Sequence, residues 1–468
     1  MSALVHDDVL LVGTGADSVA RDLFDLAQQQ PLICPHGHTD PAWFAENAAF
    51  PDPTRLLVTP DHYITRMFAS QGMSLLDFGV AQQDGTVTDD TSRQIWRRFA
   101  ENFHLFRGTP TRLWLDITFA RLFALTEPLC ARTADAAFDQ IADCLMQPGY
   151  RPRALYDRFN IEVIATTDAA LDDLGHHQAL LHEAWTGRVV PTYRPDQISD
   201  PDHEGFLAAL DRLADITGAD TTTWAGYLEA HAIRRAAFTA LGATATDHGV
   251  PDAKTANLST HEASGLFDIV RRGQADAAQR ALFRAQMLTE MARMSAKDGM
   301  VMQIHPGSSR NHSADVFRRF GRDKGFDIPV SVDFTNGLKP LLEAVGLEPG
   351  LRIILFTLDE STYARELAPL AGAYPSLVLG PAWWFHDSPE GMRRFREMTS
   401  ETAGIYNTAG FNDDTRAFPS IPARHEVARR VDAAWLARLV ADHRLREDEA
   451  REMIVELSGG LARKAYRL

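Results

Sequence analysis

Cysteine is scarce in this chain, which contains only Cys34, Cys130 and Cys144 among its 468 residues. A low and odd cysteine count without a C-x-x-C frame argues against a disulfide-stapled scaffold and favours a reducing compartment. The first residues lack a basic segment followed by a long apolar core, and no apolar run approaches the roughly 18 residues that span a bilayer. We therefore expect a cytoplasmic protein that does not enter a membrane.

Positive charge is also in deficit, because 47 lysines and arginines face 63 aspartates and glutamates, giving a net charge of −16. This balance disfavours nucleic acid and anionic membrane surfaces as partners. An acidic small molecule stays compatible with the sequence if arginines gather locally to bind it. Gly13 and Gly15 do not form a dinucleotide fingerprint, since no further glycine follows at the required offset.

Apolar runs of strand length recur along the chain, with helical patterns between them. The eight runs span residues 32–34, 162–167, 189–193, 240–246, 300–304, 352–358, 377–382 and 404–410. Most are continuously apolar, which suits parallel strands covered on both faces. Helical stretches such as 203–214, 275–296 and 361–371 separate them. Eight alternating units predict an α/β fold, namely a closed (β/α)8 TIM barrel rather than an open doubly wound sheet.

One interval is too long for a simple crossover. Residues 39–154 follow the first run and have a mostly helical pattern, for example over 91–103 and 133–146. We predict that they form a helical insertion, and that residues 1–38 and 155–468 form the catalytic barrel with helices from Arg424 onward. The insertion and these last helices offer surfaces for a homo-oligomer, although the sequence leaves the oligomeric state open.

Polar residues follow the predicted strands where a barrel of this kind carries its active site, at the carboxyl ends of the strands. The first run leads into His36-Gly37-His38, and residues two apart on a strand share a face, so two imidazoles can hold one metal ion. Zinc accepts such nitrogens at roughly 2.0–2.1 Å. Later runs are followed by Asp168, Arg194, Asp247, His305, Trp383 with Trp384, and the segment Asn412–Arg416.

Each of these residues also has an ordinary structural explanation. Asp413 or Asp414 can cap a following helix, His305 can be a satisfied core histidine, and Arg194 and Arg416 can form surface ion pairs. Neighbours on a strand face opposite ways, so one tryptophan of the pair can be plain packing. The shared position at strand ends favours a common site.

The sequence resembles the uronate isomerases (glucuronate isomerase), a branch of the amidohydrolase superfamily. The resemblance covers nearly the whole chain in the family's order. It is carried by His36-x-His38, Asp61-His62-Tyr63 with Arg66, Arg112–Asp116, Thr166-Thr167-Asp168, Tyr193–Asp196, Asp247-His248-Gly249, Val301–Gly307, Gly321–Asp327, Ala382–Asp387, Asn412–Phe418 and Arg424-His425-Glu426. The chain departs from the family at Asn412-Asp413-Asp414-Thr415-Arg416, where Leu-Thr-Asp-Ser-Arg is usual, and in the run from His305 to Asn311.

The resemblance implies a role for each matching residue. His36, His38 and Asp414 would bind one divalent metal ion per chain, with zinc expected, and His305 would be a metal ligand or another site residue. His62, Tyr63, Arg194, Arg416 and one of Trp383 and Trp384, with Trp384 preferred, would hold a sugar acid. The implied reaction interconverts D-glucuronate with D-fructuronate, or D-galacturonate with D-tagaturonate.

The general base stays open among Asp414, a metal-bound water, His62 and Tyr63. Our working hypothesis makes Asp414 both ligand and proton acceptor, with Tyr63 and His62 assisting. One rival function is a metal-dependent hydrolase of the same superfamily that acts on a sugar-acid lactone or amide. Asp247-His248 stands at the fourth strand end, where many two-metal hydrolases carry a bridging lysine. The other rival is a non-catalytic sugar-acid binder.

Overall fold

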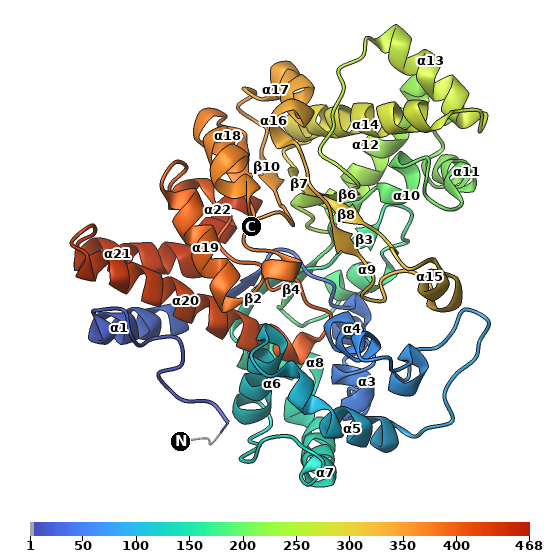
Figure 1. Ribbon diagram of the computed structural model, residues 1–468. Helices are drawn as coiled ribbons and strands as arrows, with labels where there is room; N and C mark the ends of the chain where they lie inside the picture. The colour runs from blue at the N-terminus through green and yellow to red at the C-terminus, as the bar shows by residue number, and fades with distance from the viewer. Residues whose placement is uncertain (1–3) are drawn as a thin grey trace.

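A computed structural model describes residues 4–468 as a run of parallel strands covered by helices (Figure 1). The strands are β1 Leu32–Cys34, β2 Ile161–Ala165, β3 Asp168–Ala169, β4 Arg188–Val190, β5 Tyr193–Arg194, β6 Ala245–Val250, β7 Val301–Pro306, β10 Ile353–Leu355 and β11 Leu377–Leu379. One sheet has the order β1-β2-β4 and the other β3-β5-β6-β7-β10-β11. Because β3 continues β2 and β5 continues β4, the two sheets form one parallel run.

The two ends of this run meet through single backbone contacts. Thr408 forms a parallel bridge with Leu379 at the end of β11, and the Ala409 amide donates to the Leu379 carbonyl at 2.8 Å. Further along, the amide of His38, just after β1, donates to the Thr415 carbonyl at 3.0 Å. Segment 408–415 therefore takes the eighth place beside β1. The predicted α/β barrel class is confirmed.

Two predicted strands are wrong in their limits or their type. Residues 240–246 were expected to be extended, but helix α12 (Trp224–Ala240) reaches into this run and Gly242, with φ of 92°, ends it before β6 starts at Ala245. Residues 404–410 contain a 3₁₀ helix, Ile405–Asn407, instead of a strand. Gly404 and Gly410 both have positive φ, at 70° and 80°, which an extended strand does not allow.

Helices on the outside of the run complete the barrel. They are α9 Gly175–Leu181, α10 Asp196–Ser199, α11 Phe206–Thr217, α12, α13 Thr260–Arg271, α14 Ala277–Asp298, α16 Phe334–Gly337, α17 Lys339–Val345, α18 Ala368–Ala373 and α19 Pro389–Ser400. Their ends follow ordinary capping chemistry, since Ser259 and Asp276 form capping boxes at the starts of α13 and α14. The predicted stretch 275–296 is thus confirmed as α14.

Seven α-helices lie between β1 and β2 within the described residues, at the lower side of Figure 1. They are α2 Pro41–Glu46, α3 Pro53–Leu57, α4 His62–Ser70, α5 Ser92–Glu101, α6 Pro110–Arg121, α7 Ala134–Met146 and α8 Pro152–Arg158. Their apolar cluster, with Phe68 and Phe78 stacked at 4.0 Å, also includes Leu32 of β1 and Ile164 of β2. Because this cluster is shared with the barrel, the division at residues 39 and 154 stays a prediction.

The last helices are α20 Ile421–Ala441, α21 Glu447–Val455 and α22 Leu461–Tyr466. Helices α20 and α21 run beside α1 Asp17–Gln28, and α22 closes the amino ends of the strands. Arg463 pairs with Glu162 at the start of β2, and Arg467 donates to the Gly350 carbonyl ahead of β10. Tyr466 is fully buried and donates to Gln303 Oε1 of β7 at 3.0 Å. The floor of the barrel is therefore made by α22, which leaves the carboxyl ends of the strands for the site.

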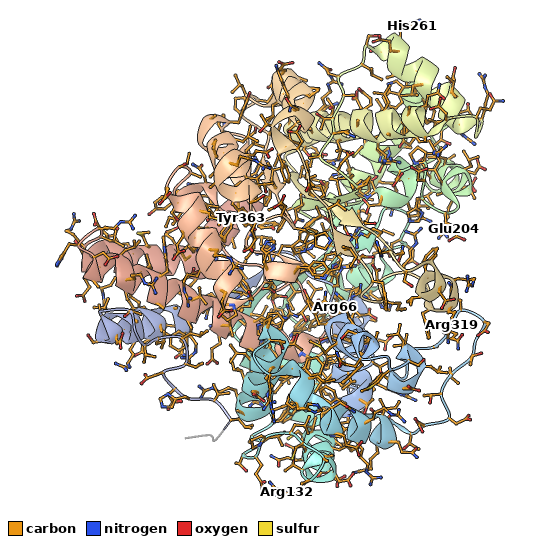
Figure 2. All side chains as sticks on the ribbon, in the orientation of Figure 1. Arg66, Arg132, Glu204, His261, Arg319 and Tyr363 are labelled. Atoms are coloured by element: carbon orange, nitrogen blue, oxygen red, sulfur yellow. The ribbon has the colours of Figure 1, made fainter. Side chains whose placement is uncertain are left out.

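Side chains fill the space between these ribbons (Figure 2). Among the labelled residues, Arg132, Glu204 and His261 are exposed at the rim, while Tyr363 is buried. Across residues 4–468, no helix has the length and apolar character needed to cross a membrane.

Candidate active site

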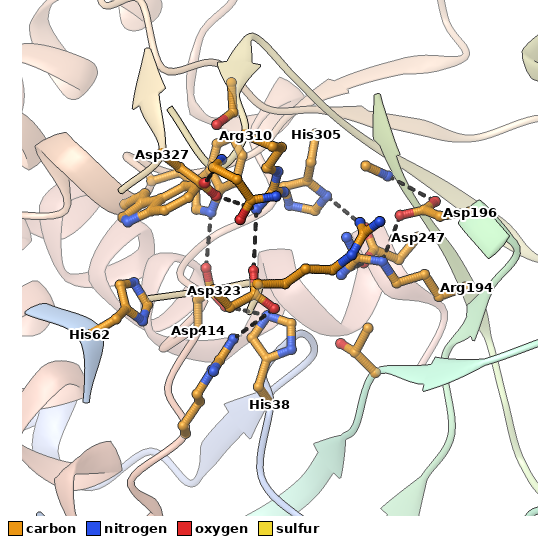
Figure 3. A pocket seen from close by; sticks show the side chains of 18 of the residues that line it. His38, His62, Arg194, Asp196, Asp247, His305, Arg310, Asp323, Asp327 and Asp414 are labelled. Carbon is orange, nitrogen blue, oxygen red and sulfur yellow. Dashed lines mark hydrogen bonds and ion pairs between the residues drawn. The ribbon is translucent and has the colours of Figure 1, made fainter. Parts of the chain in front are cut away.

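A cavity of about 940 Å³ opens at the carboxyl ends of the strands. It is lined by every residue that the sequence predicted for the site: His36, His38, His62, Tyr63, Arg194, His305, Trp383, Trp384, Asp414 and Arg416. The strand ends, helix α4 of the insertion and the segment after Thr408 each contribute to its wall (Figure 3). Residues far apart in the sequence thus meet at one concave surface.

Three of these side chains converge as a metal-binding group would. The Nε2 atoms of His36 and His38 lie 3.6 and 3.3 Å from Asp414 Oδ1. The ligand atoms of the three residues all fall within 4.8 Å of one another, and Asp414 Oδ1 is buried without a hydrogen-bond partner. Two imidazole nitrogens and one carboxylate oxygen are a donor set that divalent zinc accepts, so these residues fit a divalent metal ion.

The electrostatics of the group suit a cation. Burial lowers the pKa of His36 to about 4, so the ring is neutral at pH 7 and offers a lone pair. Removal from water opposes ionisation of Asp414, yet the close approach of the His38 and His36 rings holds its pKa well below the usual range. A neutral imidazole and an ionised carboxylate are the ligand forms that metal binding requires.

Trp383 and Trp384 both line the cavity, and Trp383 also packs in a buried cluster with Phe356, as expected of one tryptophan of the pair. They follow β11 at the start of a short 3₁₀ helix, Trp384–His386, where strand alternation does not apply. Trp383 Nε1 donates to Asp414 Oδ2 at 2.9 Å, which leaves Oδ1 facing the two histidines. Trp384 has φ of 52° and meets the ring of His62 edge to face at 5.8 Å. Trp383 orients the metal group, and Trp384 forms part of the wall.

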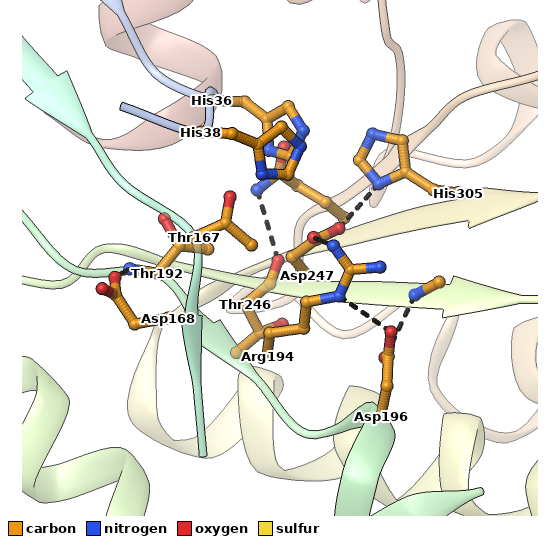
Figure 4. Close-up of polar contacts among 12 residues, drawn as sticks. His36, His38, Thr167, Asp168, Thr192, Arg194, Asp196, Thr246, Asp247 and His305 are labelled. Atoms are coloured by element: carbon orange, nitrogen blue, oxygen red, sulfur yellow. Dashed lines mark hydrogen bonds and ion pairs between the residues drawn. The ribbon is translucent and has the colours of Figure 1, made fainter. Parts of the chain in front are cut away.

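A second polar network joins β5, β6 and β7 (Figure 4). His305 Nδ1 bonds Asp247 Oδ1 at 2.7 Å, and Asp247 Oδ2 lies 3.3 Å from Arg194 Nη1. Arg194 Nε donates to Asp196 at 2.8 Å. Because Nδ1 of His305 is used in this network, only its Nε2 remains available, and this buried atom has no hydrogen-bond partner. Sequence reasoning noted Asp247 and Asp196 at strand ends but gave them no role.

His36, Asp247 and His305 also form a group of possible metal ligands. The rings of His36 and His305 are stacked with centroids 4.7 Å apart. Because His36 belongs to both groups, His305 would lie next to a metal ion held by His36, His38 and Asp414. This position is compatible with either of the roles expected for His305, ligand or site residue.

Helix α4 delivers His62 and Tyr63 from the insertion. Asp61 caps this helix, accepting the amide proton of Tyr63 at 2.8 Å, and the two aromatic rings stack at 4.7 Å. Burial, helped by the charge of Arg416, lowers the pKa of His62 to about 3, and burial raises the pKa of Tyr63 above its usual range. At neutral pH the site therefore offers a neutral imidazole and a protonated phenol.

Arg424 of α20 lines the cavity, and Asp387 pairs with it; the sequence gave neither residue a role. Arg424 Nη1 donates to Asp387 Oδ2 at 3.0 Å and to the Asp413 carbonyl at 3.2 Å. Its guanidinium lies 3.9 Å from the ring centroid of Trp114 and 5.6 Å from that of Tyr63. Burial raises the pKa of Asp387 to about 7 despite this partner. The motifs that contain both residues were the only sequence signal for them.

Asp413 and Asp414 do not cap a helix, because α20 starts after Ser420. Asp413 Oδ2 instead lies 3.3 Å from His425 Nε2, and the Cys34 sulfur lies 3.8 Å from the same nitrogen. These three buried side chains form a further group whose spacing suits a metal ion, behind the cavity wall. Arg416 is 37% exposed and its guanidinium lies 3.5 Å from Asp323 on a loop across the mouth, so it is a pocket residue more than a surface pair.

Comparisons with known proteins agree with this geometry. A family model described as glucuronate isomerase matches residues 1–463. A uronate isomerase of Mesorhizobium japonicum is 64% identical over 469 residues, which covers 100% of both chains.

Two solved structures share the fold. The crystal structure of glucuronate isomerase from Caulobacter crescentus matches with a TM-score of 0.97 at 55% identity, covering 99% of this chain and 97% of that one. The uronate isomerase structure from Thermotoga maritima matches with a TM-score of 0.92 at 25% identity, covering 99% of each chain. The resemblance seen in the sequence is confirmed, and the chain belongs to the glucuronate isomerase family.

Proposed function

We propose that this isomerase interconverts D-glucuronate with D-fructuronate and D-galacturonate with D-tagaturonate in hexuronate catabolism. The observation that carries this proposal is the meeting of the His36–His38–Asp414 group with two arginines, Arg194 and Arg416, in one cavity. The arginines can bind the C6 carboxylate of a sugar acid, and in this proposal the His36–His38–Asp414 group faces the C1 and C2 oxygens at the other end of the sugar. A hydrolase acting on neutral esters would not need these arginines.

Arg416 is the better anchor for the substrate carboxylate. Arg194 is already engaged by Asp196 at 2.8 Å and by Asp247 at 3.3 Å, whereas the ion pair of Arg416 with Asp323 is loose at 3.5 Å. A planar guanidinium meets a carboxylate with two parallel hydrogen bonds. In this proposal Arg416 fixes the acid end of the sugar, and Arg194 holds Asp247 and His305 in place.

His36, His38 and Asp414 would hold the divalent metal ion, for which we propose zinc. When bound, the ion supplies positive charge that stabilises the enediolate character developing over C1 and C2. The sugar needs this stabilisation because an open-chain aldose acquires negative charge on its oxygens when the C2 proton leaves.

The proton transfer falls to side chains around Asp414. A proton must leave C2 and return to C1, and Asp414 is the ionised carboxylate nearest to both histidines. Tyr63 stays protonated, so it suits donation of a hydrogen bond to a sugar oxygen. Neutral His62 can accept or donate at Nε2, which is buried without a partner. We assign the base to Asp414 and the hydroxyl proton movement to Tyr63 and His62.

The partner of this enzyme is a small sugar acid, and we propose the cytoplasm as its compartment. Cys34, Cys130 and Cys144 are all free in the structure, which fits a reducing environment.

A coupled spectrophotometric assay tests the proposal, with ketose formation measured from D-glucuronate and D-galacturonate and metal content measured on the same sample. We expect turnover of both sugars with about one metal ion per chain. Absence of turnover in folded, metal-loaded protein would overturn the substrate assignment. A panel of sugar-acid lactones and amides would then test the hydrolase alternative.

A further inference from the structure

A loop between two short strands carries an acidic side chain over the mouth of the active site. The strands β8 (Ser308–Ser309) and β9 (Ile328–Pro329) pair antiparallel, and the chain between them forms α15 (Ala314–Phe320) and then the loop 321–325. Asp323 lies on this loop and lines the cavity, where Figure 3 places it between Arg310 and the metal-binding group. The mechanism proposed above gives this carboxylate no task.

Asp323 faces two arginines but bonds tightly to neither. Its Oδ2 lies 3.5 Å from Arg416 Nη2, and its Oδ1 lies 3.7 Å from Arg310 Nη1. Both distances exceed the roughly 2.7–2.9 Å of a charge-assisted hydrogen bond. Its side chain is 49% exposed. The negative charge of Asp323 therefore complements the two arginines, but no short hydrogen bond ties the carboxylate to either of them.

Asp327, on the same segment, differs from Asp323 because it is buried and tightly hydrogen-bonded. It accepts from Arg310 Nη1 at 2.9 Å and from the Asn311 amide at 2.6 Å, and its side chain is 4% exposed. Asp327 therefore anchors the segment and Asp323 does not.

The backbone nevertheless fixes Asp323 above the site. Its φ is 56°, and it stands between Gly321 and Gly325, with φ of 81° and 83°. Most non-glycine residues avoid this region, and aspartate is among the few that adopt it, so the chain holds a fixed turn at this point. A Cβ at Gly325 would lie 2.8 Å from Arg66 Cβ and from the His62 carbonyl oxygen, which shows how closely the loop packs on α4. The position is imposed by the fold and not by bonds of the carboxylate.

We propose that the Asp323 carboxylate occupies, in the free enzyme, the place that the substrate carboxylate takes between Arg416 and Arg310. This inference rests on the proposed function, since it deepens the assignment of Arg416 as the acid anchor. An incoming sugar acid exchanges one carboxylate for another and leaves both arginines paired. A neutral sugar would have to displace Asp323 without replacing its charge. Asp323 is thus a specificity-determining residue that makes binding selective for acids.

The test measures binding of D-gluconate to full-length, metal-loaded protein by calorimetry. D-Gluconate has the carboxylate of a sugar acid but no aldehyde, so it cannot be isomerised. We expect Asp323→Asn and Asp323→Ser to bind it about 2- to 5-fold more tightly than the parent, the range that a loose ion pair represents. Asp315→Asn, which removes a charge from exposed α15 on the same segment, is the matched control and should not change the affinity.

The salt dependence of binding adds a second measurement. The parent enzyme exchanges carboxylates, so its affinity should change little with ionic strength, whereas the Asp323 variants form a new ion pair and should lose affinity as salt rises. Unchanged or weaker gluconate binding in both Asp323 variants, with melting temperature and metal content preserved, would overturn the inference, as would a lack of binding to all the proteins.

Failure of the proposed function would look different. In that case the parent protein turns over neither uronate, while the gluconate affinities of the parent and variants still decide the role of Asp323.

Discussion

At the scale of single residues, Asp414 has two oxygens with different tasks. Oδ2 accepts from Trp383 Nε1, and Oδ1 faces the nitrogens of His36 and His38. A tryptophan thus fixes the rotation of a carboxylate that would otherwise share both oxygens among its neighbours. Such outer partners orient a metal ligand and tune its basicity.

Asp414→Asn should abolish turnover of uronates while the protein stays folded. The amide cannot accept the C2 proton and is a poor ligand, so we expect kcat/KM to fall by about 10³-fold, the order that several kcal/mol of transition-state stabilisation represents. Kinetics, metal analysis and thermal melting on one preparation check this. Trp383→Phe removes the hydrogen bond to Oδ2 and part of the buried indole but leaves Asp414 itself in place, so its loss of activity should be smaller. Activity of Asp414→Asn close to that of the parent would remove Asp414 from its role as base.

At the scale of elements, helix α4 connects the insertion to the chemistry. Its first two residues, His62 and Tyr63, line the cavity, and its amino end is fixed by Asp61. The helices between β1 and β2 therefore contribute to the site through the amino end of α4. The position of this end determines where the side chains of His62 and Tyr63 lie.

Asp61→Ala should lower both stability and activity. Loss of a helix N-cap costs about 1 kcal/mol, and the start of α4 would then shift His62 and Tyr63. Ser259→Ala removes the equivalent cap of α13, which contributes nothing to the cavity wall, and provides the matched control. Denaturant titration should show similar losses for the two variants, and kinetic assays should show reduced kcat only for Asp61→Ala. Equal activity of both variants would mean that the cap acts on stability alone.

The elements also show what sequence alone could predict. Apolar runs located seven of the eight places in the barrel, because buried parallel strands are apolar on both faces, and H-x-H located the metal-binding group. Arg310 precedes helix α15, and Asp323 and Asp327 follow it, in segments without strand or helix periodicity. The resemblance included residues 321–327 but gave Asp323 no role beside Arg416. Arg424 lies on helix α20, which is buried on nearly all sides. The sequence of this helix does not indicate that Arg424 pairs with Asp387. The strand predicted over residues 404–410 fails at Gly404 and Gly410, because a positive φ is not visible in the sequence.

At the scale of the whole molecule, the interior holds histidines that remain neutral. Burial lowers the pKa of His177 and His386 to about 4, and that of His231 and His248 to about 3. An unfolded histidine titrates near 6.5. Between these values the unfolded chain binds more protons than the folded one, so the stability present above pH 6.5 is lost as the pH falls toward 4.

We expect the free energy of unfolding to drop by about 1.4 kcal/mol per pH unit for each such histidine below pH 6.5. Urea titrations of metal-free protein at pH 7 and pH 5 measure this, so that metal release does not contribute. His231→Asn should reduce the slope by one proton, whereas exposed His261→Asn should leave it unchanged. A slope equal in the parent and in His231→Asn would show that His231 is not neutral in the fold.

The closure of the strand run has a consequence for synthesis on the ribosome. His36 and His38 follow the first strand to emerge, but Asp414 belongs to the segment that takes the eighth place, and the floor of the barrel waits for α22. A nascent chain that ends before residue 408 has two metal-binding histidines and no carboxylate to complete their group. The metal ion proposed for this group would therefore find all three ligands only after nearly all of the protein has been made, so its capture would mark the completion of folding and would not start it.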